Sequence, residues 1–267
     1  MEIIENKFEN IFYTYFKNDN SNHTLLFLHG FTGTSSVWND YAEILKNKFN
    51  IILIDLSGHG NSESPKTIEE YSFQNQAEKI IKLLTNLGIK SISIISYSFS
   101  CYIGLLIREE MRQETKSMIF VSPYFKEKFN FFEKIIFKFI KFIWRYLISD
   151  KKFQLDYSKL KNYENPTFRD TKYTLKCTNT KDILGSVYSL KNQEGIPNLE
   201  ILEIPTLLIY GKNDKMLSDK MRSIFTKLKL AETEVIENKK HLFLKTEVLR
   251  IAKGIEIFLT KLLSPLQ

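Results

Sequence analysis

The sequence predicts an α/β protein with one mostly parallel, doubly wound sheet, because short apolar segments alternate with segments of helical period. Most of the apolar segments are nearly continuous, which is typical of parallel strands covered by helices on both faces. The 267 residues suffice for one large domain with a full core, and 43% hydrophobic residues fit a folded protein. We expect strands at residues 24–28, 51–56, 91–96, 117–122, 206–211 and 233–237.

Helical segments separate these strands, and their alternation with the strands predicts right-handed βαβ crossovers. We expect helices at residues 37–46, 68–87, 100–110 and 218–229, and a leading antiparallel hairpin at 3–16. Between about residues 123 and 200 no strand pattern occurs, while aromatic and basic residues are frequent. We therefore predict a first core part at 1–122, an inserted helical cap at 123–200 and a second core part at 201–267.

The composition favours a cytoplasmic protein that binds no nucleic acid. The N-terminal segment lacks the basic and apolar regions of a secretory signal, and no apolar run reaches the roughly 18 residues of a membrane span. Cys101 and Cys177 lack metal-ligand spacing, so we expect reduced thiols, no metal and no cofactor. The net charge of +7 comes mostly from lysines scattered singly, which argues against a nucleic-acid surface. We expect no obligate protein partner.

Ser98 is the candidate nucleophile, because it follows an expected strand in the turn Ser-Tyr-Ser-Phe-Ser and precedes an expected helix. A serine hydroxyl needs an adjacent base, and a tight strand–turn–helix exposes it by straining the backbone at the serine. The residues two positions before and after should be very small. Here they are Ser96 and Ser100, so we expect a tighter turn than glycines would give. Taken alone, the segment also fits an ordinary polar loop.

Asp214 and His241 are the candidate acid and base. Asp214 follows the expected strand at 206–211 by three residues, and His241 follows the last expected strand. The strand at 117–122 ends without a carboxylate, so Asp214 has little competition, and Asp219 is a distant second candidate. The other three histidines have different contexts. His23 lies in a polar loop, and His29 and His59 belong to loops for which we expect structural roles.

Two loops after the expected strands at 24–28 and 51–56 contain closely spaced glycines. In His29-Gly30-Phe31-Thr32-Gly33 the glycines would let the backbone turn closely, so that the Phe31 N–H points into the site. With the Phe99 N–H it would form an oxyanion hole, although a simple turn is the alternative. In the loop at 55–62 we expect Asp55 and His59 to bond backbone groups.

Together these residues resemble the α/β-hydrolase superfamily, in its serine esterase and lipase branch. The resemblance covers residues 24 to about 258 and includes the motif Gly-Lys-Asn-Asp at 211–214. Serine, then acid, then histidine is the triad order of that fold. The resemblance implies the α/β-hydrolase fold, with Ser98 as nucleophile, His241 as general base and then acid, and Asp214 orienting the imidazole. Serine at positions 96 and 100 departs from the family's usual glycines.

The resemblance implies hydrolysis of a small-molecule carboxylic ester, including lipid or other apolar acyl esters, through an acyl-enzyme on Ser98. Serine at this position argues against the dehalogenase and epoxide-hydrolase branches, which use aspartate. A menaquinone-pathway synthase-like lyase usually has an arginine where this chain has Cys101-Tyr102-Ile103. Proline-iminopeptidase-type enzymes need an acidic cap, and this cap is basic. The glycine-poor turn leaves a non-catalytic, ligand-binding relative as a further alternative.

Residues 129–148, which include eight aromatic residues, have the pattern of a basic amphipathic helix, and we expect this helix in the cap. On a helix Lys134, Lys138, Lys141 and Arg145 fall at steps of four, three and four, forming one narrow stripe beside a wide apolar surface. One interpretation is a lid whose apolar side roofs the active site while the lysines face water. The other adds peripheral contact with an anionic membrane, delivering acyl esters to Ser98.

Overall fold

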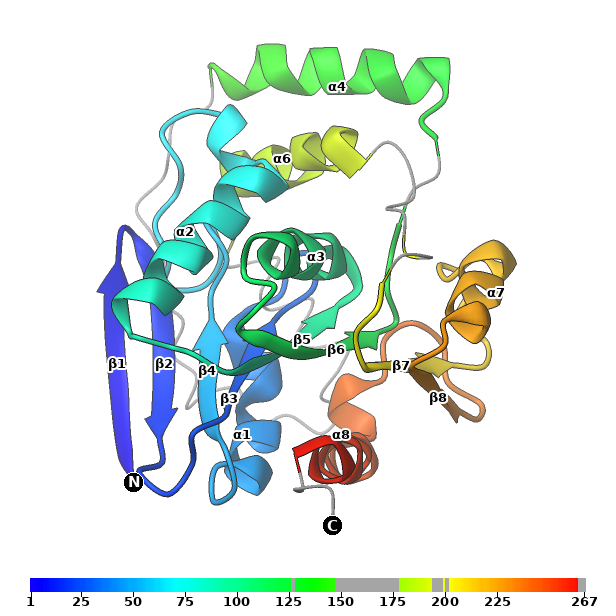
Figure 1. The fold of residues 1–267 in the computed structure, drawn as a ribbon. Coiled ribbons are helices and arrows are strands. Elements are labelled where there is room, and N and C mark those ends of the chain that lie inside the picture. Colours follow the sequence, from blue (N-terminus) through cyan, green and yellow to red (C-terminus); the bar gives the residue numbers. More distant parts are fainter. Residues whose placement is uncertain (126–127, 147–177, 194–198, 200–201, 264–267) are drawn as a thin grey trace.

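The computed structural model describes residues 1–125, 128–146, 178–193, 199 and 202–263. They contain an eight-stranded sheet of order β1-β2-β4-β3-β5-β6-β7-β8 (Figure 1). Strands β1 and β2 form an antiparallel hairpin, β2 also runs antiparallel to β4, and the other neighbouring strands are parallel. The predicted doubly wound sheet is confirmed. Its strands are β1 (Glu2–Phe8), β2 (Ile11–Lys17), β3 (Thr24–Leu28), β4 (Asn50–Ile54), β5 (Ile92–Tyr97), β6 (Thr115–Val121), β7 (Thr206–Gly211) and β8 (Ala231–Ile236).

Helices cover both faces of the sheet (Figure 1). One face packs against α2 (Phe73–Asn86), α3 (Cys101–Glu110) and α7 (Asp219–Lys227). The other packs against α1 (Asn39–Leu45) and α8 (Val248–Leu263). In β3, Leu26 and Leu28 join the first core, whereas Leu25 and Phe27 join the second. Alternate residues of the strand thus enter opposite cores, which explains its continuous apolar sequence.

The expected helix at 68–87 is divided in two. A 3₁₀ turn (Glu69–Tyr71) comes first, and α2 begins at Phe73. Ser72 between them is extended, with ψ at 147°, and its hydroxyl accepts a hydrogen bond from the Asn75 N–H at 3.3 Å. This N-cap satisfies a backbone donor that the first helical turn leaves free, and so it starts a new helix.

Two cap helices are described, α4 (Phe131–Trp144) and α6 (Thr180–Ser189). Helix α4 lies outermost, with α6 between it and the rest of the molecule (Figure 1). Phe137, Ile140 and Trp144 of α4 are buried in a cluster that includes Tyr188 of α6. The expected helix end at residue 148 and much of the expected insertion at 123–200 lie outside the described residues, so the domain boundaries stay predictions.

Asp182 links α6 to the core. Its side chain is buried, and its carboxylate accepts hydrogen bonds from the hydroxyls of Tyr71 and Ser64, the latter at 2.8 Å. A second link joins Lys141 of α4 to Glu69, with Nζ and Oε1 2.5 Å apart. Both cap helices are therefore tied to the segment between β4 and α2.

His23 is buried immediately before β3, although its sequence context suggested a polar loop. Its Nδ1 lies 2.7 Å from the Ser91 hydroxyl, and its Nε2 lies 2.8 Å from the Ser93 hydroxyl. Ser93 in turn lies 2.7 Å from the Ser117 hydroxyl, so the polar chain crosses from β5 to β6. Burial, together with the charge of Lys116, lowers the pKa of His23 to about 4.

Protonation of His23 should destabilise the protein in mild acid. Because the folded-state pKa lies below the ordinary value of 6.5, the unfolded chain binds the proton first. Stability should therefore fall as the pH drops from about 6.5 towards 4, by up to about 3 kcal/mol at roughly 1.4 kcal/mol per pKa unit. Urea unfolding of the wild type and His23→Gln at several pH values measures this loss. The variant should show a shallower loss; an equally steep one would contradict the prediction.

Candidate active site

Ser98 occupies a strained turn between β5 and α3. The 3₁₀ turn η3 (Ser98–Ser100) begins there, and the φ of Ser98 is 53°. A non-glycine residue in this left-handed region carries roughly 1–3 kcal/mol of strain. Ser98 retains slight exposure, at 7%, whereas Ser96 and Ser100 are completely buried. The geometry therefore singles out Ser98 among the three serines of the turn.

The turn accommodates both flanking serines, because Ser100 has hydrogen-bond partners and Ser96 has space beside a glycine. Ser100 Oγ accepts a hydrogen bond from the Tyr97 N–H at 3.1 Å and donates to the Leu28 carbonyl at 3.0 Å, joining the turn to the end of β3. Ser96 faces Gly104 of α3, where a Cβ atom would lie 3.2 Å from Ser96 Oγ. Space for the close approach of strand and helix is thus provided by glycine on the helix.

The structure brings together the three predicted triad residues. His241 Nε2 lies 2.7 Å from Ser98 Oγ, and His241 Nδ1 lies 2.9 Å from Asp214 Oδ2. Asp214 is fully buried, and its Oδ1 accepts a hydrogen bond from the Met216 N–H at 2.9 Å. Burial opposes ionisation of this carboxyl, but the hydrogen bond and charge of His241, with the Met216 N–H, lower its pKa overall. An ionised Asp214 holds the proton of the imidazole on Nδ1, leaving Nε2 to accept one from Ser98.

Backbone contacts hold the Asp214 and His241 loops together. The Asn213 N–H donates to the Lys239 carbonyl at 2.9 Å. Gly211, at the end of β7, makes this approach possible, because a Cβ there would lie 2.5 Å from the carbonyl oxygens of Lys239 and Lys240. The glycine before Asp214 therefore determines how closely the histidine loop can pass.

Asp219, the second candidate acid, does not reach the histidine. Its side chain is 97% exposed and pairs with Arg222 of α7 at 3.1 Å. Arg222 also donates to the Asp214 carbonyl oxygen at 2.5 Å. The pair therefore borders the acid's loop, and Asp214 is the carboxylate that contacts the imidazole.

Tyr97 is a site residue that the sequence did not reveal. Its ring stacks on the His241 ring, with centroids 5.6 Å apart and planes at 25°. Its hydroxyl donates to the His241 carbonyl oxygen at 2.9 Å, and burial raises its pKa, which keeps the donor protonated. Tyr97 thus positions the histidine loop directly beside Ser98. Because the partner is 144 positions away, no local pattern could have indicated this contact.

The loop after β3 lies beside this turn. The rings of Phe31 and Phe99 are 5.6 Å apart, so the two predicted oxyanion-hole residues approach each other. His29 shapes the loop: it accepts a hydrogen bond from the Leu56 N–H at 3.0 Å and donates one to the Gly30 carbonyl at 2.8 Å. The positive φ of this loop falls on Thr32, at 56°, while Gly30 allows a close approach, because a Cβ there would lie 2.8 Å from the Tyr97 ring. The role of the Phe31 and Phe99 N–H groups stays a prediction.

The loop at 55–62 makes the backbone bonds predicted from its sequence. The buried Asp55 carboxylate accepts from the Ser35 N–H at 2.6 Å and from the Asn61 N–H at 2.8 Å. His59 Nδ1 lies 3.1 Å from the Ser57 carbonyl oxygen, and its ring lies 5.1 Å from that of His29. Burial lowers the pKa of His59 and lowers that of His29 to about 3. These residues support the loops beside the site.

The fold agrees with comparisons to known proteins. The chain is 28% identical over 222 residues to the pimeloyl-[acyl-carrier protein] methyl ester esterase of Wigglesworthia glossinidia brevipalpis, covering 76% of this chain and 80% of the relative. A thermophilic esterase from Thermogutta terrifontis has a similar structure, with a TM-score of 0.73, 17% identity, and 98% and 99% coverage of the two chains. An esterase from Exiguobacterium antarcticum has a TM-score of 0.71, 15% identity, and 94% and 95% coverage. The family model of the alpha/beta hydrolase fold matches residues 23–248, and the chain therefore belongs to this family.

Proposed function

We propose that the protein hydrolyses carboxylic esters through an acyl-enzyme on Ser98. The observation that carries this proposal is the 2.7 Å approach of His241 Nε2 to Ser98 Oγ, with Asp214 bonded to the opposite ring nitrogen. His241 takes the hydroxyl proton as Oγ attacks the ester carbonyl, and the N–H groups of Phe31 and Phe99 stabilise the oxyanion. The protonated imidazole then gives its proton to the departing alcohol as the ester C–O bond breaks. Water, activated by His241, cleaves the acyl-serine and releases the acid.

Two observations favour an active ester hydrolase over the alternatives. The case for a non-catalytic relative rests on the glycine-poor turn, and the turn closes through Gly104 and the hydrogen bonds of Ser100. A relative that matches 76% of the chain is named as a methyl ester esterase. The lyase alternative has no comparable support, because Cys101 is buried behind the turn and supplies no cation for a polyanionic substrate.

An apolar acyl group is the expected substrate moiety. Phe99 packs between Phe31 and Phe73, with ring centroids 5.6 and 4.8 Å away. Phe31 is the most accessible of the three, at 37% exposure. Phe73 and Phe99 are buried, so Phe31 is the accessible end of this aromatic cluster, where it can bury methylene groups, each contributing about 0.8 kcal/mol.

Replacing Ser98 tests the reaction itself. The purified protein should hydrolyse p-nitrophenyl esters and react with a fluorophosphonate probe, and Ser98→Ala should abolish labelling and lower kcat on the order of 10⁴–10⁶-fold. Ser96→Ala is the matched control, because Ser96 faces Gly104 and should keep most activity. Normal turnover by Ser98→Ala, or no labelling of the wild type, would contradict the proposal.

Replacing Asp214 tests the orienting acid. Asp214→Asn cannot hold the productive imidazole tautomer, so kcat should fall by roughly 10³–10⁴-fold with little change in melting temperature. Asp219→Asn should leave kcat unchanged, because its carboxylate is exposed and paired with Arg222. Steady-state kinetics and thermal unfolding of both variants test which aspartate orients the imidazole. A loss confined to Asp219→Asn would move the role to that residue.

Acyl-chain preference tests the aromatic surface. The kcat/KM for p-nitrophenyl octanoate should exceed that for the acetate, because the longer chain can bury apolar area against Phe31. Phe31→Ala should reduce this preference several-fold while keeping the backbone N–H expected to contact the oxyanion. Leu249→Ala on α8, also exposed, is the matched control and should not change the ratio. An unchanged ratio in Phe31→Ala would place the acyl group elsewhere.

A further inference from the structure

Helix α4 has two apolar sides, and among the described residues only one of them is packed. Phe137, Ile140 and Trp144 form the buried stripe against α6. Large apolar side chains cover the opposite side and are 47–74% exposed: Phe131, Phe132, Ile135, Ile136, Phe139, Phe142 and, just after the helix, Tyr146. The lid interpretation placed the wide apolar surface inward, and this part of it is wrong. Soluble proteins rarely expose so continuous an apolar patch unless it binds something.

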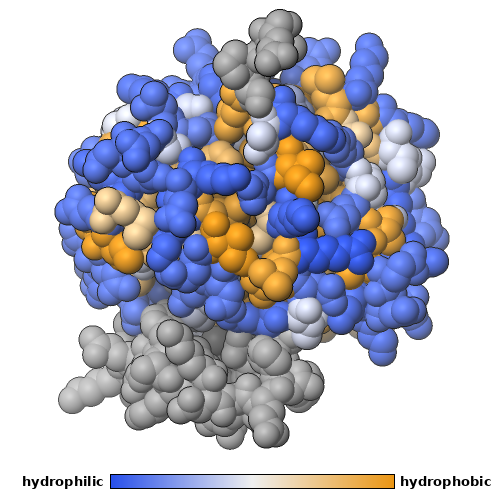
Figure 2. Space-filling model, turned by 90° about the horizontal axis from the view of Figure 1, so that it is seen from below, coloured by the Kyte–Doolittle hydropathy of each residue, from blue (hydrophilic) through white to orange (hydrophobic). Residues whose placement is uncertain are grey.

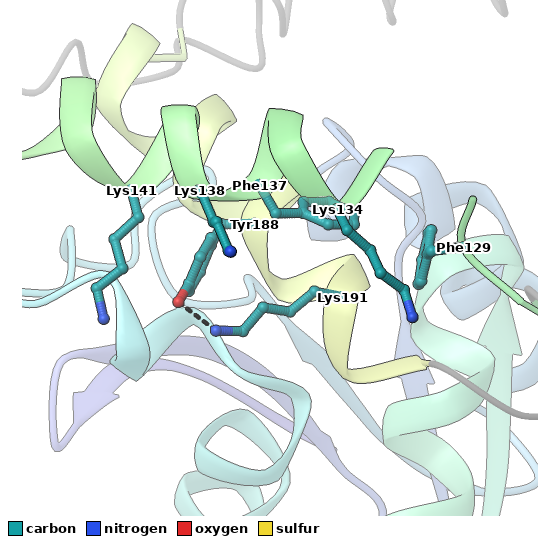
Figure 3. Close-up of a pocket in the computed structure, with 7 residues that line it drawn as sticks. All are labelled: Phe129, Lys134, Phe137, Lys138, Lys141, Tyr188 and Lys191. Carbon is teal, nitrogen blue, oxygen red and sulfur yellow. Dashed lines mark hydrogen bonds between the residues drawn. The ribbon is translucent and has the colours of Figure 1, made fainter. Parts of the chain in front are cut away.

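A stripe of basic residues runs beside this outer apolar face. Lys134, Lys138 and Lys141 follow one another at helical spacing along one flank of α4, as predicted. Figure 3 shows their side chains extending from α4 towards Lys191, which comes from the segment after α6. The first-turn carboxylate Glu133 lies on the packed side of the helix, four positions before Phe137, and is engaged in the N-terminal capping box with Asn130. The flank is therefore predominantly positive.

The lysines line a hollow of about 420 Å³ whose walls also include Phe129, Phe137 and Tyr188. Lys191 donates to the Tyr188 hydroxyl and lies over its ring, 3.7 Å from the centroid (Figure 3). Lys141 is paired with Glu69, and Lys134, Lys138 and Lys191 lie near it in the lining of the hollow. Like charges gathered around one concave surface raise the local potential and attract an anionic group.

We infer that the outer face of α4 and its lysine flank dock the protein onto an anionic phospholipid surface. A helix with one apolar face and a basic flank can lie in the plane of a membrane, with its apolar side about 5–10 Å into the headgroup boundary. Phe132 and Phe139 would enter that boundary, while Lys134 and Lys138 contact lipid phosphates. An exposed apolar face with cations along its flank matches the acyl region and the phosphates of an anionic lipid surface, and this complementarity favours lipid over other occupants.

The shape of the molecule permits this contact. Among the elements that the structure describes, helix α4 is the outermost on its side (Figure 1), so none of them lies between it and a planar surface. The side of the molecule opposite α4 is mostly hydrophilic, with apolar residues in small separate groups (Figure 2). Among the described helices, none is long and apolar enough to cross a bilayer. The inferred contact lies along the outer face of α4, and it does not depend on the proposed ester hydrolysis.

Vesicle co-sedimentation tests this inference. The full-length protein should bind phosphatidylcholine vesicles containing phosphatidylglycerol, bind pure phosphatidylcholine much more weakly, and lose affinity as salt rises. Phe132→Gln with Phe139→Gln should weaken binding at least about tenfold. Lys134→Gln and Lys138→Gln should each weaken it roughly fivefold. Unchanged melting temperature and fluorophosphonate labelling would show that the α4 variants are folded.

Matched controls lie away from the cap. Leu249→Gln with Ile257→Gln on α8, and Lys227→Gln with Lys229→Gln near α7, remove similarly exposed groups and should leave vesicle binding unchanged. Ser98→Ala should bind vesicles like the wild type, which separates this inference from the proposed hydrolysis. No binding to anionic vesicles at low salt would overturn it. A lipid-free dimer that the Phe132 and Phe139 changes dissociate, without vesicle binding, would instead assign the face to a second copy.

Discussion

The left-handed backbone at Ser98 is the constraint on which the rest of the site depends. With φ at 53°, the chain can leave β5 and enter α3 within one tight turn, but only if strand and helix approach closely. Gly104 permits that approach from the helix side, and the Ser100 hydroxyl hydrogen-bonds the turn to the end of β3. The strain is therefore held by contacts on both sides of the serine. The same turn places Phe99 next to the loop that carries Phe31.

Sheet order brings the other two groups to this turn. β5, β6, β7 and β8 are neighbours in parallel, so the loops after them open at the same edge. The Asp214 loop and the His241 loop then share backbone contacts around Gly211, while Tyr97, the residue before Ser98, stacks on the imidazole. The buried carboxylate stays ionised because His241 and the Met216 N–H bond it. Fold, loop contacts and electrostatics thus hold the His241 ring between Ser98 and Asp214.

The sequence allowed the sheet, and the three residues that meet at its edge, to be predicted because both have strong local signals. The strands β3 and β7 have the predicted bounds, and the others differ by one or two residues. Ser98, Asp214 and His241 each follow a strand, which could be read without knowledge of packing. Contacts between distant segments could not be predicted this way. The stacking of Tyr97 on His241 and the burial of His23 between serines of neighbouring strands both depend on side-chain packing in the folded sheet.

Helix α4 shows why a periodic pattern alone does not determine orientation. Its lysine stripe was evident from spacing, but the remaining surface is apolar over so wide an arc that either part could have packed inward. In the structure the narrow stripe of Phe137, Ile140 and Trp144 packs against α6. Trp144 Nε1 also donates a hydrogen bond to the Lys181 carbonyl at 2.9 Å, which stabilises this orientation of the helix. The wider apolar arc is already exposed in this structure, without any movement of α4. Docking through this arc would therefore require no prior conformational change, so its binding free energy would not be reduced by the cost of exposing a buried surface.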